Sequence, residues 1–222
     1  MDIVTRLLWG WDARIHAPDQ LGKVFVVTGA NSGLGYETTL RLAERNALVV
    51  MAVRNTESGN RAAEAIRYQV RGAKLLVWHV NMASFRSVRA FASRVAASFP
   101  SGIHGLVNNA GVLNAPVSGA AATSENGIEV TRAVDYFGPV LLTHLLLPSL
   151  AVAAPSRVVS VSSLGEALGA LDWGDLRGLN SPASTFRAYG CAKLMLLMWT
   201  RELNRRLRGT GIDCFAVHPA VV

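Results

Sequence analysis

Cysteine, charge and long apolar runs are all scarce in this sequence, and each scarcity excludes a class of protein. The 222 residues include two cysteines, Cys191 and Cys214, which have neither CxxC nor metal-ligand spacing. A disulfide framework and a metal centre are therefore not expected, and both cysteines are interpreted as reduced thiols of an intracellular protein. No stretch of ~20 apolar residues is present, which argues against a transmembrane helix.

Charged residues make up 17% of the chain and hydrophobic residues 50%. Disordered chains combine low hydrophobicity with high charge, so this composition predicts a folded protein with a sizeable core. The net charge is +7, but the arginines are scattered and form no dense basic tract. The sequence therefore predicts a solvated basic surface and no nucleic-acid partner. A positive surplus also favours a phosphorylated cofactor.

Residues 1–20 are interpreted as an N-terminal extension of a domain that covers residues 21–222. Within residues 1–15, two leucines and two tryptophans stand between Arg6 and Arg14. Charge interrupts this piece too often for a secretory signal. It can make a peripheral contact with a membrane surface, or pack against the domain itself, which we favour. The protein is accordingly expected in the cytoplasm or at the periphery of a membrane.

Apolar runs alternate with amphipathic helical stretches along almost the whole chain. The runs are nearly continuous in apolar residues, as expected of parallel strands covered on both faces. Repeated strand–helix units predict an α/β fold of Rossmann type, a doubly wound parallel sheet in a three-layer αβα arrangement. The expected strands are 24–28, 48–53, 75–80, 105–108, 158–162 and 213–217, and the expected helices are 34–45, 57–70, 84–98, 125–150 and 186–208.

Two stretches read as loops. Residues 118–124 are small and polar, and precede an expected helix. Residues 164–185 are rich in Gly, Asp, Ser and Pro and show no convincing periodicity. Long loops within compact domains are usually functional, so the second loop is expected to border a substrate pocket.

A glycine-rich turn, TGANSGLG over residues 28–35, follows the first expected strand and opens the first helix. Glycine lets a pyrophosphate approach the backbone closely, and the helix N-terminus supplies N–H donors and the positive end of its dipole. The GxxxGxG spacing differs from the GxGxxG fingerprint, and such a turn can also serve only to join strand and helix. The cofactor-binding candidates in this turn are Gly29, Asn31, Ser32, Gly33, Leu34 and Gly35.

Three further motifs follow in order along the chain. They are Asn108-Asn109-Ala110-Gly111 after the fourth expected strand, Ser162-Ser163 at the end of the fifth, and Tyr189-Gly190-Cys191-Ala192-Lys193 in the last helix. With TGANSGLG they resemble the motifs of the short-chain dehydrogenase/reductase family, over roughly residues 20–222. The stretches TSENGIEVTRAVDYFGPVLLT and ALDWGDLRGL are similar to the retinol dehydrogenase-like branch, which includes WW-domain oxidoreductase. The resemblance implies a nicotinamide cofactor and, for the branch, a lipophilic carbonyl or alcohol substrate.

The end of the second expected strand bears on the choice of cofactor. Sites that prefer NAD usually place an acid there for the ribose 2′-hydroxyl, whereas this chain has Val53-Arg54-Asn55. A guanidinium can hold a 2′-phosphate through charge-assisted bonds, so Arg54 favours NADP(H) over the alternative of a surface arginine. Asn81 stands where the family usually has Asp, and its amide can both donate and accept. On the resemblance, the other cofactor contacts are Asn55, Asn81, Met82, Asn109, Ala110, Gly111, Tyr189, Lys193 and Pro219.

Tyr189 and Lys193 are four residues apart and so lie on one face of the last expected helix. A free phenol has a pKa of ~10, too high for base chemistry near neutrality, and a neighbouring ammonium stabilises the tyrosinate. Tyr189 is therefore predicted to act as acid and base at the reacting oxygen. Alone, such a pair is more often a surface pair, but the other motifs favour catalysis. The resemblance adds that Lys193 binds the nicotinamide ribose, and Ser163 the substrate oxygen.

Asp135 departs from the family pattern. In the stretch VDYFGPVLLT, residues 134–143, it replaces an Asn that in the family supports a helix distortion and a water of the proton relay. An ionised Asp accepts hydrogen bonds but does not donate them, and its charge would weaken the effect of Lys193 on Tyr189. Pro139 is expected to kink the same helix. Asp135 is included among the catalytic candidates, with a weakened or rearranged relay.

The sequence ends in HPAVV, similar to the family's HPG segment with Ala220 in place of Gly. Family members continue through another helix and a last strand, so we expect a C-terminally truncated domain that lacks both. The sixth strand would then be an exposed edge. The helices 125–150 and 186–208 resemble those that form dimers in the family, so the resemblance implies a homodimer.

These observations predict an NADP(H)-dependent oxidoreductase that transfers a hydride between the nicotinamide and a lipophilic carbonyl or alcohol. The substrate would be of retinoid, steroid or aliphatic type. The alternative is an NADP(H)-binding regulatory protein with weak or no turnover, motivated by Asp135, Pro139, Ala220 and the expected truncation. The substrate's identity, the direction of reaction and the oligomeric state are left open by the sequence.

Overall fold

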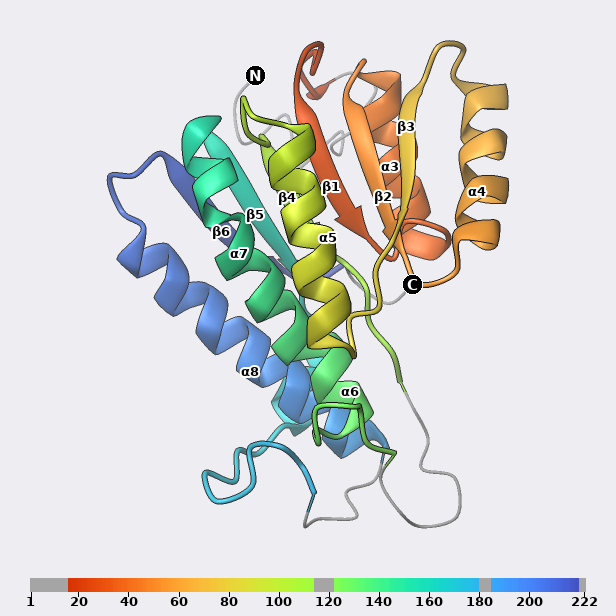
Figure 1. Ribbon diagram of the computed structural model, residues 1–222. Helices are drawn as coiled ribbons and strands as arrows, with labels where there is room; N and C mark the ends of the chain where they lie inside the picture. Colours follow the sequence, from red (N-terminus) through yellow and green to blue (C-terminus); the bar gives the residue numbers. More distant parts are fainter. Residues whose placement is uncertain (1–15, 114–121, 180–184, 220–222) are drawn as a thin grey trace, which may run out of the picture.

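A six-stranded parallel sheet runs through the middle of the protein (Figure 1). The computed structural model describes residues 16–113, 122–179 and 185–219. The strand order β3-β2-β1-β4-β5-β6 means that the chain runs from β1 to one edge, returns, and runs from β4 to the other. The strands are β1 Val24–Thr28, β2 Leu48–Val53, β3 Lys74–His79, β4 Gly105–Asn108, β5 Ser156–Val161 and β6 Ile212–Val217.

The central strands are covered on both faces, which explains their continuous apolar sequence. Val26 and Val27 of β1 are both 0% exposed, although their side chains belong to different core clusters. In the sheet register Val26 is paired with Val50 of β2 and with Leu106 of β4. The doubly wound parallel sheet expected from the sequence is confirmed.

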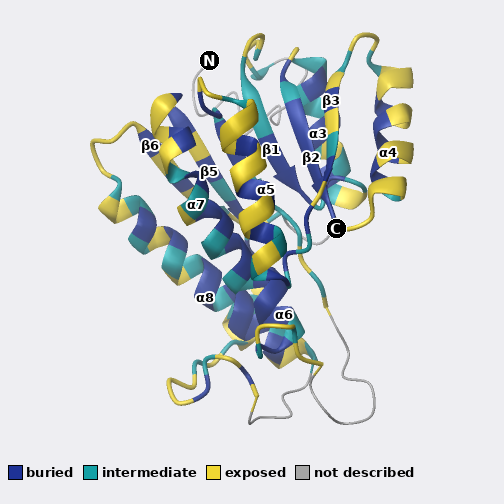
Figure 2. Ribbon diagram, in the orientation of Figure 1, coloured by how far each residue is buried: buried dark blue, intermediate teal, exposed yellow. Residues whose placement is uncertain are grey.

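Helices cover the two faces and complete the three layers (Figure 2). On one face α3 (Gly33–Glu44) and α4 (Thr56–Gln69) contribute buried residues such as Leu40 and Ile66. On the other face α5 (Phe85–Ser98), α7 (Gly138–Val152) and α8 (Thr185–Arg206) contribute Phe91, Leu146 and Leu203. Each fully buried side chain of this size stabilises the fold by roughly 1.5–3 kcal/mol relative to exposure.

The expected helix 125–150 is wrong at its start and is not uniform. Residues 125–129 form turns and an isolated β-bridge, and the helix begins only at α6 (Val130–Arg132). A π-helical turn, η1 (Ala133–Phe137), separates α6 from α7. Because π-turns occur mostly as single bulges at functional sites, this irregularity indicates that the segment has a functional role.

Local chemistry explains where this helix starts and why it tolerates proline. The carboxylate of Glu129 accepts hydrogen bonds from two backbone N–H groups of the first turn, which fixes the helix start. Pro139, which was expected to kink this helix, stands inside the continuous helix Val130–Val152, directly after the π-turn, where the regular i→i−4 hydrogen bonds that a proline would break are already interrupted. The continuous helix Val130–Val152 is long and apolar enough to cross a membrane, yet 56% of its apolar window is buried in the protein.

The other expected elements differ from the structure by one or two residues at their ends. The expected loop 164–185 contains a short 3₁₀ helix, η2 (Leu164–Leu168). Expectations for residues 1–15, for parts of the two loops and for Ala220 concern segments outside the described residues, namely 1–15, 114–121, 180–184 and 220–222.

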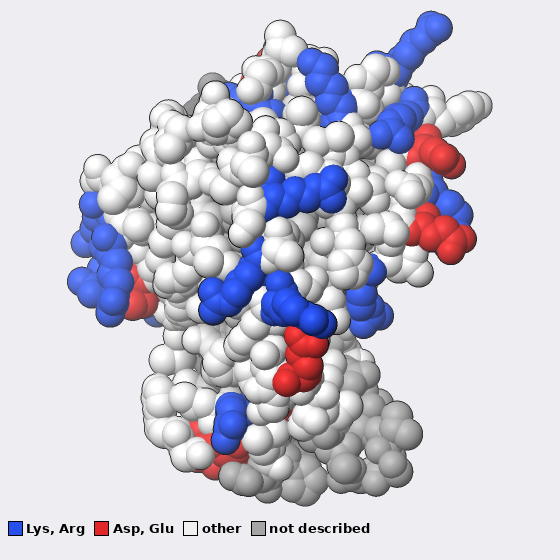
Figure 3. Space-filling model, in the orientation of Figure 1, with Lys and Arg blue, Asp and Glu red and all other residues white. Residues whose placement is uncertain are grey.

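The exposed strand at the sheet edge and the distribution of surface charge agree with the expectations from the sequence. Among the described strands β6 lies at one edge, and its Phe215 and Val217 are 47% and 39% exposed. Lys and Arg side chains stand in separate groups on the face shown in Figure 3, as their scattered positions predict. The guanidinium of Arg94 packs 4.1 Å above the ring of Trp78, so part of this charge covers an aromatic surface.

Candidate functional site

Two adjoining pockets open at the carboxyl ends of the strands, where the strand order reverses between β1 and β4. Ligands of doubly wound sheets bind at this reversal. The turn pocket is named for the glycine-rich turn and the tyrosine pocket for Tyr189. The two pockets share Leu34, Asn109, Gly111 and Val112, so they lie next to each other.

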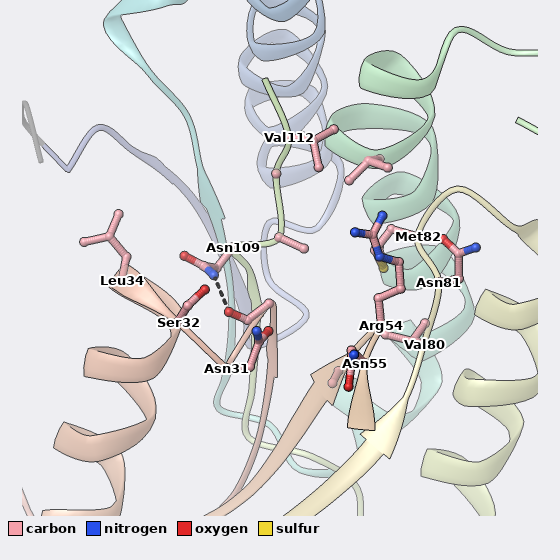
Figure 4. A pocket seen from close by; sticks show the side chains of 15 residues that line it. Asn31, Ser32, Leu34, Arg54, Asn55, Val80, Asn81, Met82, Asn109 and Val112 are labelled. Atoms are coloured by element: carbon pink, nitrogen blue, oxygen red, sulfur yellow. Dashed lines mark hydrogen bonds between the residues drawn. The ribbon is translucent and has the colours of Figure 1, made fainter. Parts of the chain in front are cut away.

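The glycine-rich turn forms one wall of the turn pocket (Figure 4). Gly29 and Gly33 have φ angles of +66° and +51°, a region that favours glycine. A Cβ on Gly33 would meet nothing within 4 Å, so the backbone there is open to an approaching group. The N-cap residue Ser32 makes no side-chain cap, which leaves the first N–H groups of α3 for a ligand. The turn therefore suits a phosphate.

Gly35 packs closely against Gly29 and Asn109 behind the glycine-rich turn. A Cβ on Gly35 would overlap the carbonyl oxygen of Gly29 and lie 2.5 Å from Nδ2 of Asn109. Gly35→Ala should therefore destabilise the protein by about 1–3 kcal/mol, since the backbone must shift to admit the methyl group. Thermal unfolding checks this, with a drop of about 2–4 °C expected for each kcal/mol.

The matched control for that prediction is Gly174→Ala. Gly174 lies in an exposed loop without a positive φ, and its Cβ would meet only the Asp172 carboxylate at 3.3 Å. This variant should unfold at the temperature of the unmodified protein. Equal unfolding temperatures for Gly35→Ala and Gly174→Ala would contradict the assigned role of Gly35.

Thr28 ties the two sides of the turn pocket together, a role that the sequence reasoning missed. Its Oγ1 donates to the carbonyl of Val107 at 3.2 Å and accepts from the N–H groups of Asn109 and Ala110, both at 3.0 Å. The side chain of Asn109 in turn donates to the Thr28 carbonyl at 2.8 Å. The threonine before the turn therefore fixes the position of the Asn109-Ala110-Gly111 segment.

Arg54 brings positive charge to the far end of the turn pocket. Of the described residues that line this pocket, Arg54 is the only charged one, and none is acidic. Its side chain is exposed, and Figure 4 shows it on the opposite side of the pocket from Ser32 and Leu34. A pocket with a guanidinium and no carboxylate favours a ligand that carries negative charge at this end.

The side-chain amides of Asn55 and Asn81, which line the same pocket as Arg54, each accept a hydrogen bond from the backbone. Asn55 is the N-cap of α4, and its Oδ1 accepts from the N–H of Ser58 at 3.0 Å. Oδ1 of Asn81 accepts from the N–H of Ala83 at 3.1 Å. Asn81 and the buried Met82 both line the turn pocket.

The tyrosine pocket holds the proposed reacting groups. Ser163, Tyr189, Lys193 and Pro219 all line it, together with apolar residues from several elements. Lys193 is one helical turn beyond Tyr189, and its Nζ lies 5.4 Å from the centroid of the Tyr189 ring. The strand β5 ends at Val161, so Ser162 and Ser163 follow the strand rather than ending it. Ser163 caps η2 by accepting from the N–H of Gly165 at 3.1 Å.

Close backbone packing holds η2 against α8 beside Tyr189. A Cβ on Gly190 would lie 2.5 Å from the carbonyl oxygen of Gly165, and one on Gly165 would lie 3.2 Å from the Tyr189 ring. Glycine at both positions lets the segment that carries Ser163 approach the helix that carries Tyr189. Gly190, inside the Tyr189–Lys193 motif, therefore has a packing role of its own.

Asp135 lies in the π-turn and forms a buried ion pair with Lys193. Its Oδ2 is 3.3 Å from Nζ of Lys193, with side-chain exposures of 0% and 4%. Its Oδ1 accepts from the N–H of Val112 at 2.8 Å, and Nζ of Lys193 also donates to the Val161 carbonyl at 3.1 Å. Burial raises the pKa of Asp135 to about 6, although the Lys193 charge opposes this shift.

Most predicted site residues come together, and a few take a supporting position. Gly33 and Gly35 shape the turn without lining either pocket, and Asp135 lies beneath Gly111 rather than in a pocket. A Cβ on Gly111 would lie 3.0 Å from Oδ2 of Asp135, so this glycine leaves room for the ion pair. The structure adds lining residues that no motif indicated, namely Ala52, Val80, Val112 and Val134.

Neither a disulfide nor a candidate metal site is found within the described residues. Cys191 and Cys214 are buried and unpaired. The described part of the chain has no group of three His, Cys, Asp or Glu residues that could hold a metal ion.

The sequence profile of the family described as short chain dehydrogenase matches residues 23–222. The chain therefore belongs to the short-chain dehydrogenase family, an oxidoreductase family that uses nicotinamide cofactors. It is 43% identical to retinol dehydrogenase 12 of Mus musculus over 201 residues, which are 90% of this chain and 62% of that protein. It is 38% identical to retinol dehydrogenase 13 of Homo sapiens over 200 residues, 90% of this chain and 59% of that protein.

Solved structures share the fold. An uncharacterized protein from Mycobacterium paratuberculosis matches with a TM-score of 0.82 and 36% identity, covering 94% of this chain and 72% of that one. A metagenomic short-chain oxidoreductase in complex with NADP matches with a TM-score of 0.72 and 24% identity, covering 90% and 83%. The family and its retinol dehydrogenase-like branch, expected from the motifs, are confirmed. The chain spans about three fifths of the length of the two retinol dehydrogenases.

Proposed function

We propose that the chain binds NADP(H) along the two adjoining pockets and transfers a hydride between the nicotinamide and a lipophilic carbonyl or alcohol. The observation that carries this proposal is that the two pockets adjoin at Asn109, Gly111 and Val112, which line both of them. This arrangement places a phosphate-suited turn and Arg54 at one end and Tyr189 at the other. A dinucleotide is long enough to need both ends.

The choice of NADP(H) over NAD(H) rests on charge. A 2′-phosphate near Arg54 would gain charge-assisted hydrogen bonds that the 2′-hydroxyl of NAD cannot match. A carboxylate that would accept from that hydroxyl is missing among the described lining residues. The glycine-rich turn would hold the pyrophosphate, and Asn81 and Met82 would lie along the adenine.

The residues of the tyrosine pocket would handle the proton. When bound, the nicotinamide supplies or accepts the hydride at the substrate carbon. In reduction the Tyr189 hydroxyl donates its proton to the carbonyl oxygen, and in oxidation the tyrosinate takes the proton from the alcohol. Ser163 would hold the substrate oxygen through its hydroxyl. Lys193 would favour the tyrosinate and hold the nicotinamide ribose.

The rim of the tyrosine pocket supports a lipophilic substrate. Leu113, Leu164, Leu168 and Phe186 line this pocket and are 51–64% exposed. Apolar side chains this open to water gain most when a ligand covers them. The substrate type is therefore proposed as retinoid, steroid or aliphatic, in keeping with the name of the retinol dehydrogenase relatives.

A panel of retinoid, steroid and aliphatic aldehydes and ketones tests this proposal. Oxidation of NADPH, followed by its absorbance, should be fastest with the apolar carbonyls and slow with short polar ones. Equal rates with polar and apolar carbonyls would contradict the substrate class. A homodimer and a peripheral membrane contact through residues 1–15 stay predictions from the sequence.

The second candidate function is an NADP(H)-binding regulatory protein with weak or no turnover. The observation in its favour is the ion pair in which Asp135 engages the ammonium of Lys193. The same panel discriminates the two functions, because a regulatory protein binds NADPH without oxidising it.

A further inference from the structure

The Asp135–Lys193 ion pair weakens the electrostatic effect of Lys193 on Tyr189. A lone ammonium near a phenol favours the ionised form of that phenol. A carboxylate 3.3 Å from the ammonium turns the single charge into a dipole, whose field falls off faster with distance. The Tyr189 ring centroid is 5.4 Å from the ammonium, well beyond the separation of the pair. Tyr189 therefore experiences only part of the field of Lys193.

The surroundings keep this pair in place. Both side chains are buried, so solvent screens their attraction little. The Val112 N–H and the Val161 carbonyl hold the carboxylate and the ammonium from opposite sides. The carboxylate lies in the π-turn, whose altered hydrogen bonding places residue 135 against α8. Within the described residues Lys193 has no other ion-pair partner.

From this geometry we propose that Asp135 is a positioning residue that keeps Tyr189 protonated to higher pH than Lys193 alone would. The proposal rests on the proposed function, and it specifies the direction in which the site works best. Carbonyl reduction needs the phenol as proton donor, whereas alcohol oxidation needs the tyrosinate. The pair therefore suits the site to carbonyl reduction over a wider pH range and moves alcohol oxidation to more alkaline pH.

Other titratable groups face the same region and have to be separated from this effect. They are Glu129, the N-cap residue of α6, Arg132 of α6, Tyr136 of η1, Glu166 of η2, Arg187 and Cys191 of α8, Asp175 in the loop, and His218 after β6. Glu129 slightly raises the pKa of Asp135 through its charge, and burial raises the pKa of Tyr136. A readout specific to tyrosine ionisation excludes all of these except Tyr136.

The test is a spectroscopic titration of tyrosinate absorbance in the unmodified chain, Asp135→Asn and Asp135→Ser, each compared with the same protein carrying Tyr189→Phe. The subtraction isolates Tyr189 from the other three tyrosines. The midpoint for Tyr189 should fall by about one pH unit in both variants. An Asn side chain still accepts from the Val112 N–H, and the smaller serine removes the charge in a second way. Circular dichroism verifies the fold.

The matched control is Asp172→Asn, which removes one negative charge from an exposed loop residue whose carboxylate accepts from the Gly174 N–H. Its Tyr189 midpoint should not move. An unchanged or higher midpoint in both Asp135 variants would overturn the proposal. The titration needs no substrate, so it remains decisive even if the chain fails to oxidise NADPH.

Rates in the two directions give the functional readout. In Asp135→Asn, alcohol oxidation should reach half its maximum about one pH unit lower, and carbonyl reduction should decline about one pH unit earlier. A merely structural role would lower both rates and leave their pH midpoints unchanged, which would also overturn the proposal. Lack of turnover in every variant, with the expected tyrosinate shift, would contradict the proposed function alone.

Discussion

Tyr189→Phe is expected to lower kcat/KM for carbonyl reduction by about 10²–10⁴-fold, the usual range for removing a general acid. The ring still packs against Gly165, so the fold and the pocket should persist. Binding of NADPH should weaken far less than turnover, because Tyr189 is only one of several expected cofactor contacts and its hydroxyl acts mainly in the proton transfer. Steady-state kinetics and a calorimetric NADPH titration together give the measurement.

The matched control is Tyr68→Phe, which removes a phenol hydroxyl from a side chain that is 93% exposed on α4. Its kinetics should equal those of the unmodified protein. A Tyr189→Phe variant that retains more than a tenth of the activity would show that another group or water supplies the proton. A large loss of NADPH binding would instead assign Tyr189 mainly to cofactor contact.

Arg54→Ala has the second largest expected effect, and it acts on the cofactor rather than on the chemistry. The unmodified chain should bind NADPH at least about tenfold more tightly than NADH, since a guanidinium makes strong bonds to a phosphate. The variant should lose this preference by weakening NADPH binding while leaving NADH binding nearly unchanged. Dissociation constants for both cofactors, measured at one fixed salt concentration, provide the test.

Arg61→Ala serves as the control for charge alone. Arg61 is an exposed residue of α4 that forms an ion pair with Glu57, and it lines neither pocket. Its removal changes the net charge by the same amount as Arg54→Ala, yet the NADPH preference should remain. Equal binding of NADPH and NADH by the unmodified chain would contradict the NADP(H) assignment.

The sheet and the order of the motifs could be predicted from the sequence because they depend on short-range patterns. Buried parallel strands such as β2 leave continuous apolar runs, and the glycine-rich turn has to follow the first strand. The Tyr189–Lys193 spacing fixes both side chains on one helical face regardless of tertiary detail. These features needed no knowledge of what packs against them.

The π-turn and its consequences were not predictable in the same way. The stretch around Asp135 reads as an uninterrupted helix, and only the hydrogen bonds show that α6 and α7 are separated by η1. The role of Thr28 depends on residues about 80 positions later, which no local pattern contains. Sequence reasoning identified Asp135 as unusual, but the contact between its carboxylate and the ammonium of Lys193 is a tertiary fact.

Transfer of deuterium from NADPH labelled at C4 to a lipophilic aldehyde tests the central claim most directly. The label has to be on the face of the nicotinamide that reacts, so both stereoisomers are used, and the product alcohol is analysed by mass spectrometry. We expect one deuterium in the alcohol from one of the two isomers, and almost none with Tyr189→Phe. NADPH that binds tightly but transfers no deuterium from either isomer to any aldehyde of the panel would contradict this claim.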